Sequence, residues 1–376
     1  MVLRSLSALL LLLAALAAHA VVVKTEHVEA ELVAERSGIT PGASVAVALR
    51  LKMQEHWHTY WKNPGDSGLA TKIAWKLPAG FEAGAIQWPH PKALPTGPLT
   101  NYGYDGEVLL LTDIKVPAGL KAGEQVNVTA RADWLACKDV CIPEHAQLSL
   151  ALPVVSGEAP RNSVWQAKFA ATRSALPQEL TGFKLAAGVT SQPSPSAGNA
   201  RTLDLRVTST ETSVPPFSRV HFFPERGDLI QHAAPQQLWR DGEAYRLRVP
   251  LAAGVKEVSS VAGVLVAEPG WGAAGAGKAV TVSAVIDAAL PSLAPNATVV
   301  AVPANVAPAP TGSSALPASL WVALAFALIG GAILNLMPCV FPVLGIKIMS
   351  FVERAHDERR VLRAQGLMFA LGVLVA

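Results

Sequence analysis

Residues 133–144 have the sequence Asp133-Trp134-Leu135-Ala136-Cys137-Lys138-Asp139-Val140-Cys141-Ile142-Pro143-Glu144, with two of the three cysteines of the 376-residue chain. Three positions separate Cys137 from Cys141, and regular structure or a tight hairpin can bring such cysteines within bonding range. A disulfide would close a ring of about five residues, for which chain entropy predicts about 2 kcal/mol of stabilisation. So small a gain favours a bridge that is made and broken during function.

The pair has two alternative interpretations. Reactivity needs thiolate character, which Lys138 beside Cys137 favours and Asp139 opposes. A fixed surface disulfide is the first alternative. A metal site is the second, because His145 extends the pattern to C-x3-C-x3-H. Pro143 argues against a helix that would place these three ligands on one face.

Residues 1–20 resemble a secretory signal. Arg4 supplies a positive charge, residues 9–17 form an apolar core, and residues 18–20 (Ala-His-Ala) match a cleavage site. The apolar core is too short for an ordinary membrane span, although an uncleaved anchor is the alternative. The mature chain would begin near Val21, in a compartment where disulfides persist.

From residue 21 to residue 155 the pattern is that of β-structure. Valine and leucine at positions 45, 47 and 49 alternate with the residues between them, and residues 108–111, 126–130 and 147–152 are further strand candidates. Proline and glycine recur between these runs. Short strands with regular turn signals predict an antiparallel β-sandwich.

Two polar and aromatic clusters lie in this region, at residues 56–61 (His-Trp-His-Thr-Tyr-Trp) and 101–107 (Asn-Tyr-Gly-Tyr-Asp-Gly-Glu). On a strand, His56 and His58 would share a face, which allows either a metal pair or ordinary sheet packing. The Tyr-Gly-Tyr part of the second cluster fits a loop that covers the cysteines and equally the entry of a strand. Both choices stay open at this point.

Residues 156–200 have the character of a connector with a short helix at 164–173. A second β-rich module is predicted at 201–290, with alternating runs at 203–207, 245–249 and 280–282 and no recognisable catalytic constellation. We expect this module to act as a spacer or in partner recognition. Residues 291–317 are rich in proline and alanine, which indicates a semi-rigid linker.

Residues 320–346 contain no charged side chain, and this run is long enough to span a bilayer. Inside it, Pro338 and Pro342 flank Cys339, so the helix is either simply kinked or broken where it lines a cavity. Lysine and arginine between residues 347 and 363 place the following loop in the cytoplasm. We expect residues 318–376 to begin a multi-span α-helical domain that continues beyond Ala376.

Four stretches resemble the DsbD/ScsB family of transmembrane thiol:disulfide interchange proteins. They are residues 57–68 (Trp-His-Thr-Tyr-Trp-Lys-Asn-Pro-Gly-Asp-Ser-Gly), 101–107, 133–144 and 335–342 (Asn-Leu-Met-Pro-Cys-Val-Phe-Pro). The resemblance implies an immunoglobulin-like periplasmic domain with a redox cysteine pair, followed by a multi-span membrane domain. It also implies a C-terminal thioredoxin-like domain, which would lie in a part missing from this chain.

In this family, electrons pass from cytoplasmic thioredoxin through membrane cysteines to the thioredoxin-like domain, and the N-terminal pair receives them and reduces periplasmic disulfide proteins. The resemblance therefore implies that Cys137, Cys141 and Cys339 are catalytic, with no cofactor and no metal. It implies a multi-pass protein of the bacterial inner membrane, with residues 21–317 in the periplasm. It also connects the chain with electron transport and cytochrome c biogenesis.

Three functions compete on this basis. The first is a membrane-bound protein-disulfide reductase that works by thiol–disulfide exchange. The second is a periplasmic copper- or zinc-binding module that uses Cys137, Cys141 and His145, with His56 and His58 as further ligands. The third is a membrane-anchored scaffold with a static disulfide. The net charge is +3 and only 16% of residues are charged, so there is no electrostatic case for a nucleic-acid partner.

Overall fold

The computed structural model describes residues 19–194, 198–210, 216–271, 277–287 and 290–300. Within these ranges the chain is mainly β, as the sequence predicts, with one helix, α2 (Gln166–Ala175). Cys339 and the rest of the predicted membrane domain at 318–376 lie outside the described residues, as do residues 1–18 of the predicted signal. No helix in the described ranges is long and apolar enough to cross a membrane.

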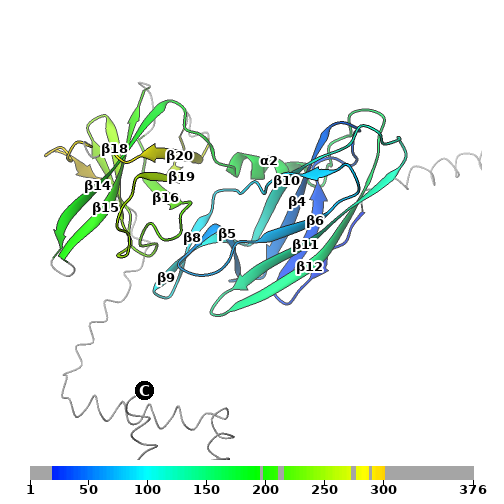
Figure 1. The fold of residues 1–376 in the computed structure, drawn as a ribbon, viewed down its shortest axis with the longest axis horizontal. Helices are drawn as coiled ribbons and strands as arrows, with labels where there is room; N and C mark the ends of the chain where they lie inside the picture. Colours follow the sequence, from blue (N-terminus) through cyan, green and yellow to red (C-terminus); the bar gives the residue numbers. More distant parts are fainter. Residues whose placement is uncertain (1–18, 195–197, 211–215, 272–276, 288–289, 301–376) are drawn as a thin grey trace, which may run out of the picture. The chain divides into compact units, whose positions relative to one another are not determined.

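The first β-sandwich consists of two antiparallel sheets (Figure 1). The larger sheet has the strand order β1-β12-β11-β5-β9-β8, and β6 also pairs with β11. The smaller sheet has the order β2-β3-β4-β10-β7. The larger sheet comprises β1 (His19–Ala20), β5 (His58–Gly65), β6 (Lys72–Lys76), β8 (Lys92–Thr96), β9 (Leu99–Asp105), β11 (Gln125–Cys137) and β12 (Cys141–Pro153). The smaller sheet comprises β2 (Val23–Lys24), β3 (Val28–Ala34), β4 (Ser44–Met53), β7 (Glu82–Ala83) and β10 (Glu107–Lys115).

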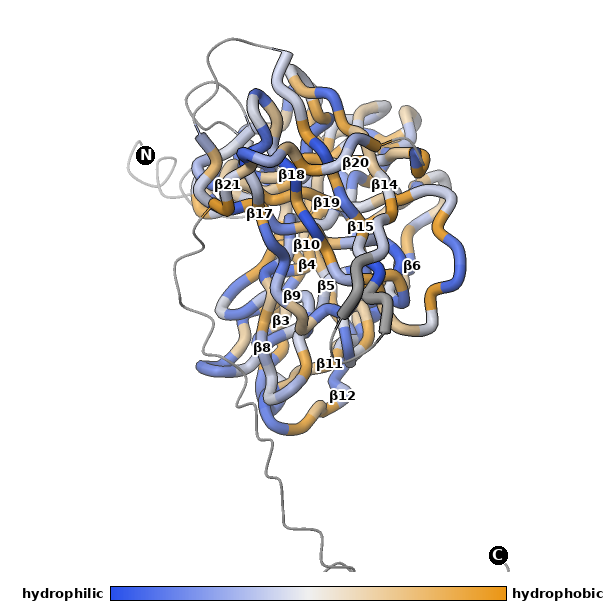
Figure 2. Tube along the Cα trace, turned by 90° about the vertical axis from the view of Figure 1, so that its left-hand side faces the viewer, coloured by the Kyte–Doolittle hydropathy of each residue, from blue (hydrophilic) through white to orange (hydrophobic). Residues whose placement is uncertain are grey.

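The burial pattern explains how the strands are used. Strand β11 alternates between buried and more exposed side chains along most of its length, as expected when one face packs on the core. The banding of orange and blue along the strands in Figure 2 reflects this alternation. Residues 45–51 of β4 are all buried. The reason is helix α2, whose Phe169 packs with Ala46 and Ala48 on the face of β4 that points away from the main core.

A second β-sandwich follows, with the sheet orders β13-β20-β19-β16 and β14-β15-β18-β17-β21. Its strands are β13 (Gln178–Glu179), β14 (Phe183–Ser194), β15 (Gly198–Ser209), β16 (Arg219–Pro224), β17 (Gln237–Asp241), β18 (Ala244–Pro250), β19 (Ser260–Glu268), β20 (Ala279–Val285) and β21 (Thr298–Val299). The strands predicted at 203–207, 245–249 and 280–282 are present. Strand β14 lies within the segment 156–200 and pairs along its length with β15, and the domain boundaries themselves stay predictions.

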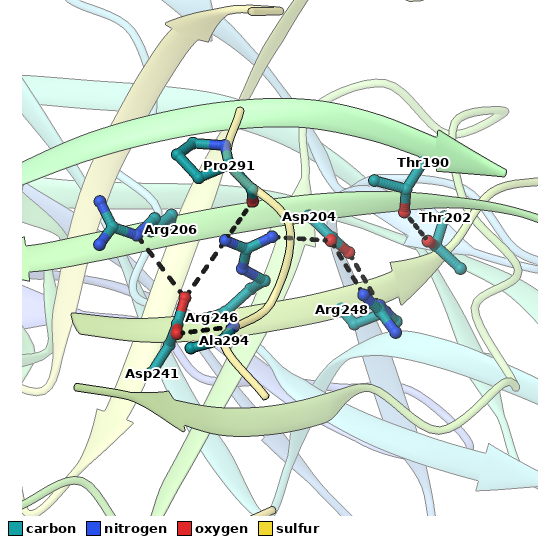
Figure 3. Close-up of polar contacts among 9 residues, drawn as sticks. All are labelled: Thr190, Thr202, Asp204, Arg206, Asp241, Arg246, Arg248, Pro291 and Ala294. Carbon is teal, nitrogen blue, oxygen red and sulfur yellow. Dashed lines mark hydrogen bonds and ion pairs between the residues drawn. The ribbon is translucent and has the colours of Figure 1, made fainter. Parts of the chain in front are cut away.

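A buried network of ion pairs lies in the second sandwich (Figure 3). Arg246 on β18 has none of its surface exposed. Its Nη1 lies 3.4 Å from a carboxylate oxygen of Asp204, and its Nη2 lies 3.2 Å from a carboxylate oxygen of Asp241. Arg248, on the same strand, binds Asp204 through Nε at 3.0 Å. The buried carboxylate of Asp204 is thus held by two guanidinium groups.

The same network fastens the end of the described chain to the second sandwich. Arg246 Nη2 donates to the carbonyl oxygen of Pro291 at 2.6 Å. The carboxylate of Asp241 accepts from the backbone N–H of Ala294 at 3.2 Å. Farther on, β21 pairs with β17 at the edge of the sheet. Residues 290–300 are therefore a strap bound to the second sandwich through polar contacts and strand pairing.

Replacing Arg246 with leucine should lower the free energy of unfolding by about 3–5 kcal/mol, because the variant leaves buried carboxylates short of a partner. The matched control is Arg226→Leu, which removes an exposed ion pair to Asp228 and should change stability little. Denaturant unfolding followed by circular dichroism measures both variants. Equal stability of the two variants would contradict the role assigned to the buried network.

Partly buried histidines also affect stability. Burial lowers the pKa of His221 on β16 to about 4, and the nearby charges of Arg219 and His232 act in the same direction. Burial also lowers the pKa of His58 and of His90. In the unfolded chain a histidine binds a proton near its ordinary pKa of about 6.5. Just below that pH, the unfolded chain therefore binds protons at these histidines while the folded chain does not.

The contribution of these neutral histidines to the free energy of unfolding should consequently be fully present above about pH 6.5. It should be lost as the pH drops towards 4, because only the unfolded chain gains the proton in that window. For His221 the loss should not exceed about 3 kcal/mol. His221→Gln, which does not titrate, should flatten the decline in Tm between pH 7 and pH 4.5. The control is His145→Gln, at an exposed position, and a decline in His221→Gln as steep as in this control would refute the assignment.

Candidate functional site

The two cysteines form the last residue pair of the β11–β12 hairpin. The strands pair residue by residue along their whole length, and the register ends with Cys137 opposite Cys141. Residues 138–140 form the loop, which is closed by a hydrogen bond from the Lys138 N–H to the Val140 carbonyl. Directly opposed residues of an antiparallel pair have neighbouring side chains. The two cysteines, with Cα atoms 4.1 Å apart, are joined by a disulfide.

The two cysteines differ in accessibility. Cys137 has 1% of its surface exposed, because its strand β11 also pairs with β5, where His58 is its partner. Cys141 is exposed. Its strand β12 has β1 as its other partner in the described chain, and that pairing lies at the opposite end, at residues 150 and 151. An incoming thiol would therefore meet Cys141 before Cys137.

Tyr60 on β5 contacts the exposed cysteine. Its hydroxyl oxygen lies 3.3 Å from Cys141 Sγ. A disulfide sulfur carries no proton, so the Tyr60 hydroxyl is the donor. Burial raises the pKa of Tyr60, an effect that the Ser67 hydroxyl partly offsets, so the phenol stays protonated at neutral pH. If the disulfide is reduced, the same hydroxyl is placed to donate to a Cys141 thiolate and to favour that form.

The loop after β5 lies on the Tyr60 ring. A Cβ atom at Gly68 would lie 2.2 Å from ring atoms of Tyr60, and the φ of Gly68 is +97°, so this position requires glycine. The loop is tied to β9, because the backbone N–H and hydroxyl of Ser67 both donate to Asn101 Oδ1. The Thr100 N–H also donates to the Asp66 carboxylate at 2.7 Å. The ring of Tyr60 is thus packed against the backbone of Gly68, in a loop that hydrogen bonds hold to β9.

The Tyr-Gly-Tyr stretch forms strand β9 and not a loop over the cysteines. Tyr102 and Tyr104 are buried, and burial raises the pKa of both phenols. The Tyr104 hydroxyl donates to the Pro89 carbonyl at 2.7 Å. Gly103 permits the close pairing with β5, since a Cβ there would lie 1.9 Å from the carbonyl oxygen of Thr59. Of the two open interpretations, the strand is the one found.

His56 and His58 do not share the face of a strand. His56 lies in the turn before β5 with a φ of 70° and is exposed. His58 begins β5 and is buried. Burial lowers its pKa, although the neighbouring charge of Asp105 opposes the shift. The alternating pattern of residues 56–61 did not reveal that the chain turns at His56.

A buried carboxylate supports the hairpin from the other strand. Glu144 accepts hydrogen bonds from the Thr25 hydroxyl at 2.5 Å, the His27 N–H at 3.0 Å and the Trp134 indole N–H at 3.2 Å. The ring of His27 lies 2.9 Å from the same carboxylate and stacks on Trp57 with centroids 3.6 Å apart. The carboxylate thus fastens the N-terminal part of the sandwich to β12.

The proposed metal ligands are dispersed. The sulfur atoms of Cys137 and Cys141 are bonded to one another, and His145 is exposed farther along β12, opposite Asp133. Across the described residues, no group of three or more histidine, cysteine, aspartate or glutamate side chains is arranged to hold a metal ion. The third cysteine, Cys339, lies outside the described residues.

A comparison with protein families finds a match that spans most of the first sandwich. Residues 29–153 match the family described as "Thiol:disulfide interchange protein DsbD, N-terminal". This part of the chain is similar to the N-terminal domain of DsbD. It contains both cysteines of the disulfide, Tyr60 and the whole of the β11–β12 hairpin. No curated protein sequence matches the chain.

A structural comparison finds matches among solved structures. The N-terminal periplasmic domain of ScsB from Proteus mirabilis is 20% identical, and the match covers 70% of this chain and 94% of that one, with a TM-score of 0.48. A protein of unknown function from Porphyromonas gingivalis W83 is 11% identical, with coverages of 68% and 99% and a TM-score of 0.19. Both TM-scores are below 0.5.

Sequence reasoning located the cysteine pair and missed its neighbour Tyr60. The contact joins residues 81 positions apart, so no local pattern reveals it. The glycines of the loop 65–68 were a signal for a turn after β5. They did not show that this turn lies on a tyrosine ring.

Replacing Tyr60 with phenylalanine should raise the pKa of the Cys141 thiol in the reduced chain, because the donor to the thiolate is lost. A hydrogen bond to a charged group is worth about 1.5–3 kcal/mol, so alkylation of Cys141 by iodoacetamide near pH 7 should slow roughly tenfold or more. Trypsin cleaves after Lys138, which separates the two cysteines, so mass spectrometry can follow Cys141 alone.

The matched control for this prediction is Tyr104→Phe, which removes a hydroxyl that donates to the Pro89 carbonyl. This control should leave the pH dependence of Cys141 alkylation unchanged. A Tyr60→Phe variant with the wild-type profile would show that the hydroxyl has no influence on the sulfur.

Proposed function

We propose that this chain is a protein-disulfide reductase whose DsbD N-terminal domain exchanges electrons with partner proteins through the Cys137–Cys141 pair. The observation that carries the proposal is the unequal exposure of two bonded cysteines, one exposed and one buried. Thiol–disulfide exchange needs one accessible sulfur for the mixed disulfide and a second close by to resolve it. The hairpin register supplies both.

Each step in the reducing direction is a sulfur-to-sulfur transfer. The thiolate of Cys141 attacks a disulfide of the partner, so that a Cys141–partner bond forms and the partner's second sulfur leaves as a thiolate. The thiolate of Cys137 then attacks Cys141 Sγ, and the partner's first sulfur leaves. The partner has gained two electrons and its thiolates take up protons, while Cys137 and Cys141 are again a disulfide. The reverse sequence reduces the pair.

The source of the electrons is the second part of the proposal. The stretch around Cys339 resembles the membrane cysteine motif of the DsbD/ScsB family. On this basis Cys339 is a relay in the bacterial inner membrane that takes electrons from cytoplasmic thioredoxin. A thioredoxin-like domain would carry them to the Cys137–Cys141 pair, with residues 21–317 in the periplasm. The substrates would be periplasmic disulfide proteins, including those of cytochrome c biogenesis.

Single cysteine variants test the assignment of the two roles. Cys137→Ser should accumulate a mixed disulfide, because Cys141 still attacks and the resolving thiol is gone. Cys141→Ser should accumulate far less, because the remaining Cys137 is buried. Incubation of the reduced full chain with oxidised glutathione, followed by non-reducing mass spectrometry, measures both adducts.

The double variant Cys137→Ser/Cys141→Ser controls for adducts on Cys339. If neither single variant forms an adduct on its hairpin cysteine, the exchange function is wrong. A reduction potential of the pair below about −300 mV would instead indicate the static bridge, since structural disulfides lie in that range. Equal adducts on both variants would refute the division of roles between the two sulfurs.

A further inference from the structure

Strand β5 bulges away from its neighbour directly after Tyr60. Tyr60 pairs with Gly103 of β9, and the pairing resumes only with Gly65 opposite Asn101. Residues 61–64 therefore stand opposite the single residue Tyr102, and the extra residues bend the strand at this point. The path of β5 next to Tyr60 depends on whatever holds these extra residues.

A side-chain amide from the bulge bonds to the second sandwich. Asn63, which is 3% exposed, donates from Nδ2 to the carbonyl oxygen of Pro224 on β16 at 2.7 Å. Its Oδ1 accepts from the N–H of Gly65 at 3.1 Å. One amide therefore links β16 to the residue at which β5 rejoins β9. The backbone of the second sandwich also lies close, since a Cβ at Gly227 would be 3.3 Å from Asn63 Oδ1.

Aromatic contacts reinforce this link on both strands. Phe223 on β16 contacts the edge or face of Trp61 and of Tyr102, with ring centroids 6.3 Å and 4.8 Å apart. The ring of His232 meets Tyr102 in the same T-shaped way at 4.9 Å. Perpendicular aromatic pairs at these distances add to the energy of burial. Trp61 on β5 and Tyr102 on β9 thus pack on the second sandwich.

We propose that the second sandwich is part of the redox site, and that Asn63 is a positioning residue that sets the Tyr60 hydroxyl at Cys141 through the bulge of β5. The inference rests on the proposed thiol exchange, and it assigns the second sandwich a role in the chemistry of the cysteine pair. That role differs from the spacer or partner-recognition role expected from sequence.

The geometry explains why a small change at Asn63 reaches the sulfur. The Tyr60 ring lies against the backbone of Gly68, so it cannot rotate to compensate for a shift of its own strand. The distance from its hydroxyl to Cys141 Sγ is already 3.3 Å. Hydrogen bonds weaken steeply when the donor moves out of line. Movement of β5 at the bulge therefore changes the stabilisation of the Cys141 thiolate.

Two variants on opposite sides of the contact test this inference in the reduced full chain, with the pH profile of Cys141 alkylation as the readout. Asn63→Ala removes the bond to Pro224, and alkylation near pH 7 should slow roughly threefold, towards the Tyr60→Phe value. Gly227→Ala lies wholly in the second sandwich and presses on Asn63 Oδ1. It should slow alkylation in the same direction, by roughly a factor of two.

The matched control is Gly254→Ala, because a Cβ at this exposed glycine of the second sandwich meets no atom within 4 Å. It should keep the wild-type profile. A wild-type profile in Gly227→Ala would overturn the inference, even if Asn63→Ala were altered, because Asn63→Ala also loses a bond to Gly65 inside the first sandwich. Wild-type chain that fails to exchange with oxidised glutathione would instead refute the proposed function, while the alkylation profiles would still be readable.

Discussion

The register of the β11–β12 hairpin is the constraint on which the site depends. Side chains on paired strands alternate between faces, so a shift of one residue would turn each inward-facing residue of β11 outward. The buried residues of β11 thus hold Cys137 opposite Cys141. The core thereby fixes the geometry of the cysteine pair at the tip of the hairpin, and buried Tyr60 places its hydroxyl beside the sulfur of Cys141. The packing of many buried side chains thus determines where the Cys137–Cys141 disulfide lies.

The different neighbours of the two strands create the difference between the two sulfurs. Strand β11 is an interior strand at Cys137, whereas at Cys141 β12 pairs with β11 alone among the described strands. The same sheet therefore supplies one accessible cysteine and one protected cysteine through its strand pairing. Tyr60 adds a directed donor to the accessible sulfur. Its phenol is kept protonated by burial, so it remains a donor over the physiological pH range.

The sequence was informative where structure depends on near neighbours. Period-two alternation and short apolar runs identified several strands in each sandwich, and the short spacing of the cysteines predicted that a bond between them was possible. It failed where the chain departs from a local rule or where distant segments meet. The positive φ of His56 is invisible in an alternating pattern. The strand at Tyr102–Tyr104 requires Gly103 to lie against β5, and that contact exists only in the folded sheet.

The strap formed by residues 290–300 has a mechanical consequence. Strand β21 of the strap pairs with β17 at the edge of the sheet. The buried Arg246 donates a hydrogen bond to the carbonyl oxygen of Pro291, at the start of the strap. Tension applied to the chain beyond Val300 would load these contacts before it reached any strand of the first sandwich. The first pairing to be loaded would be that of β21 with β17. In chain order, such tension would therefore reach the second sandwich before the hairpin that holds Cys137 and Cys141.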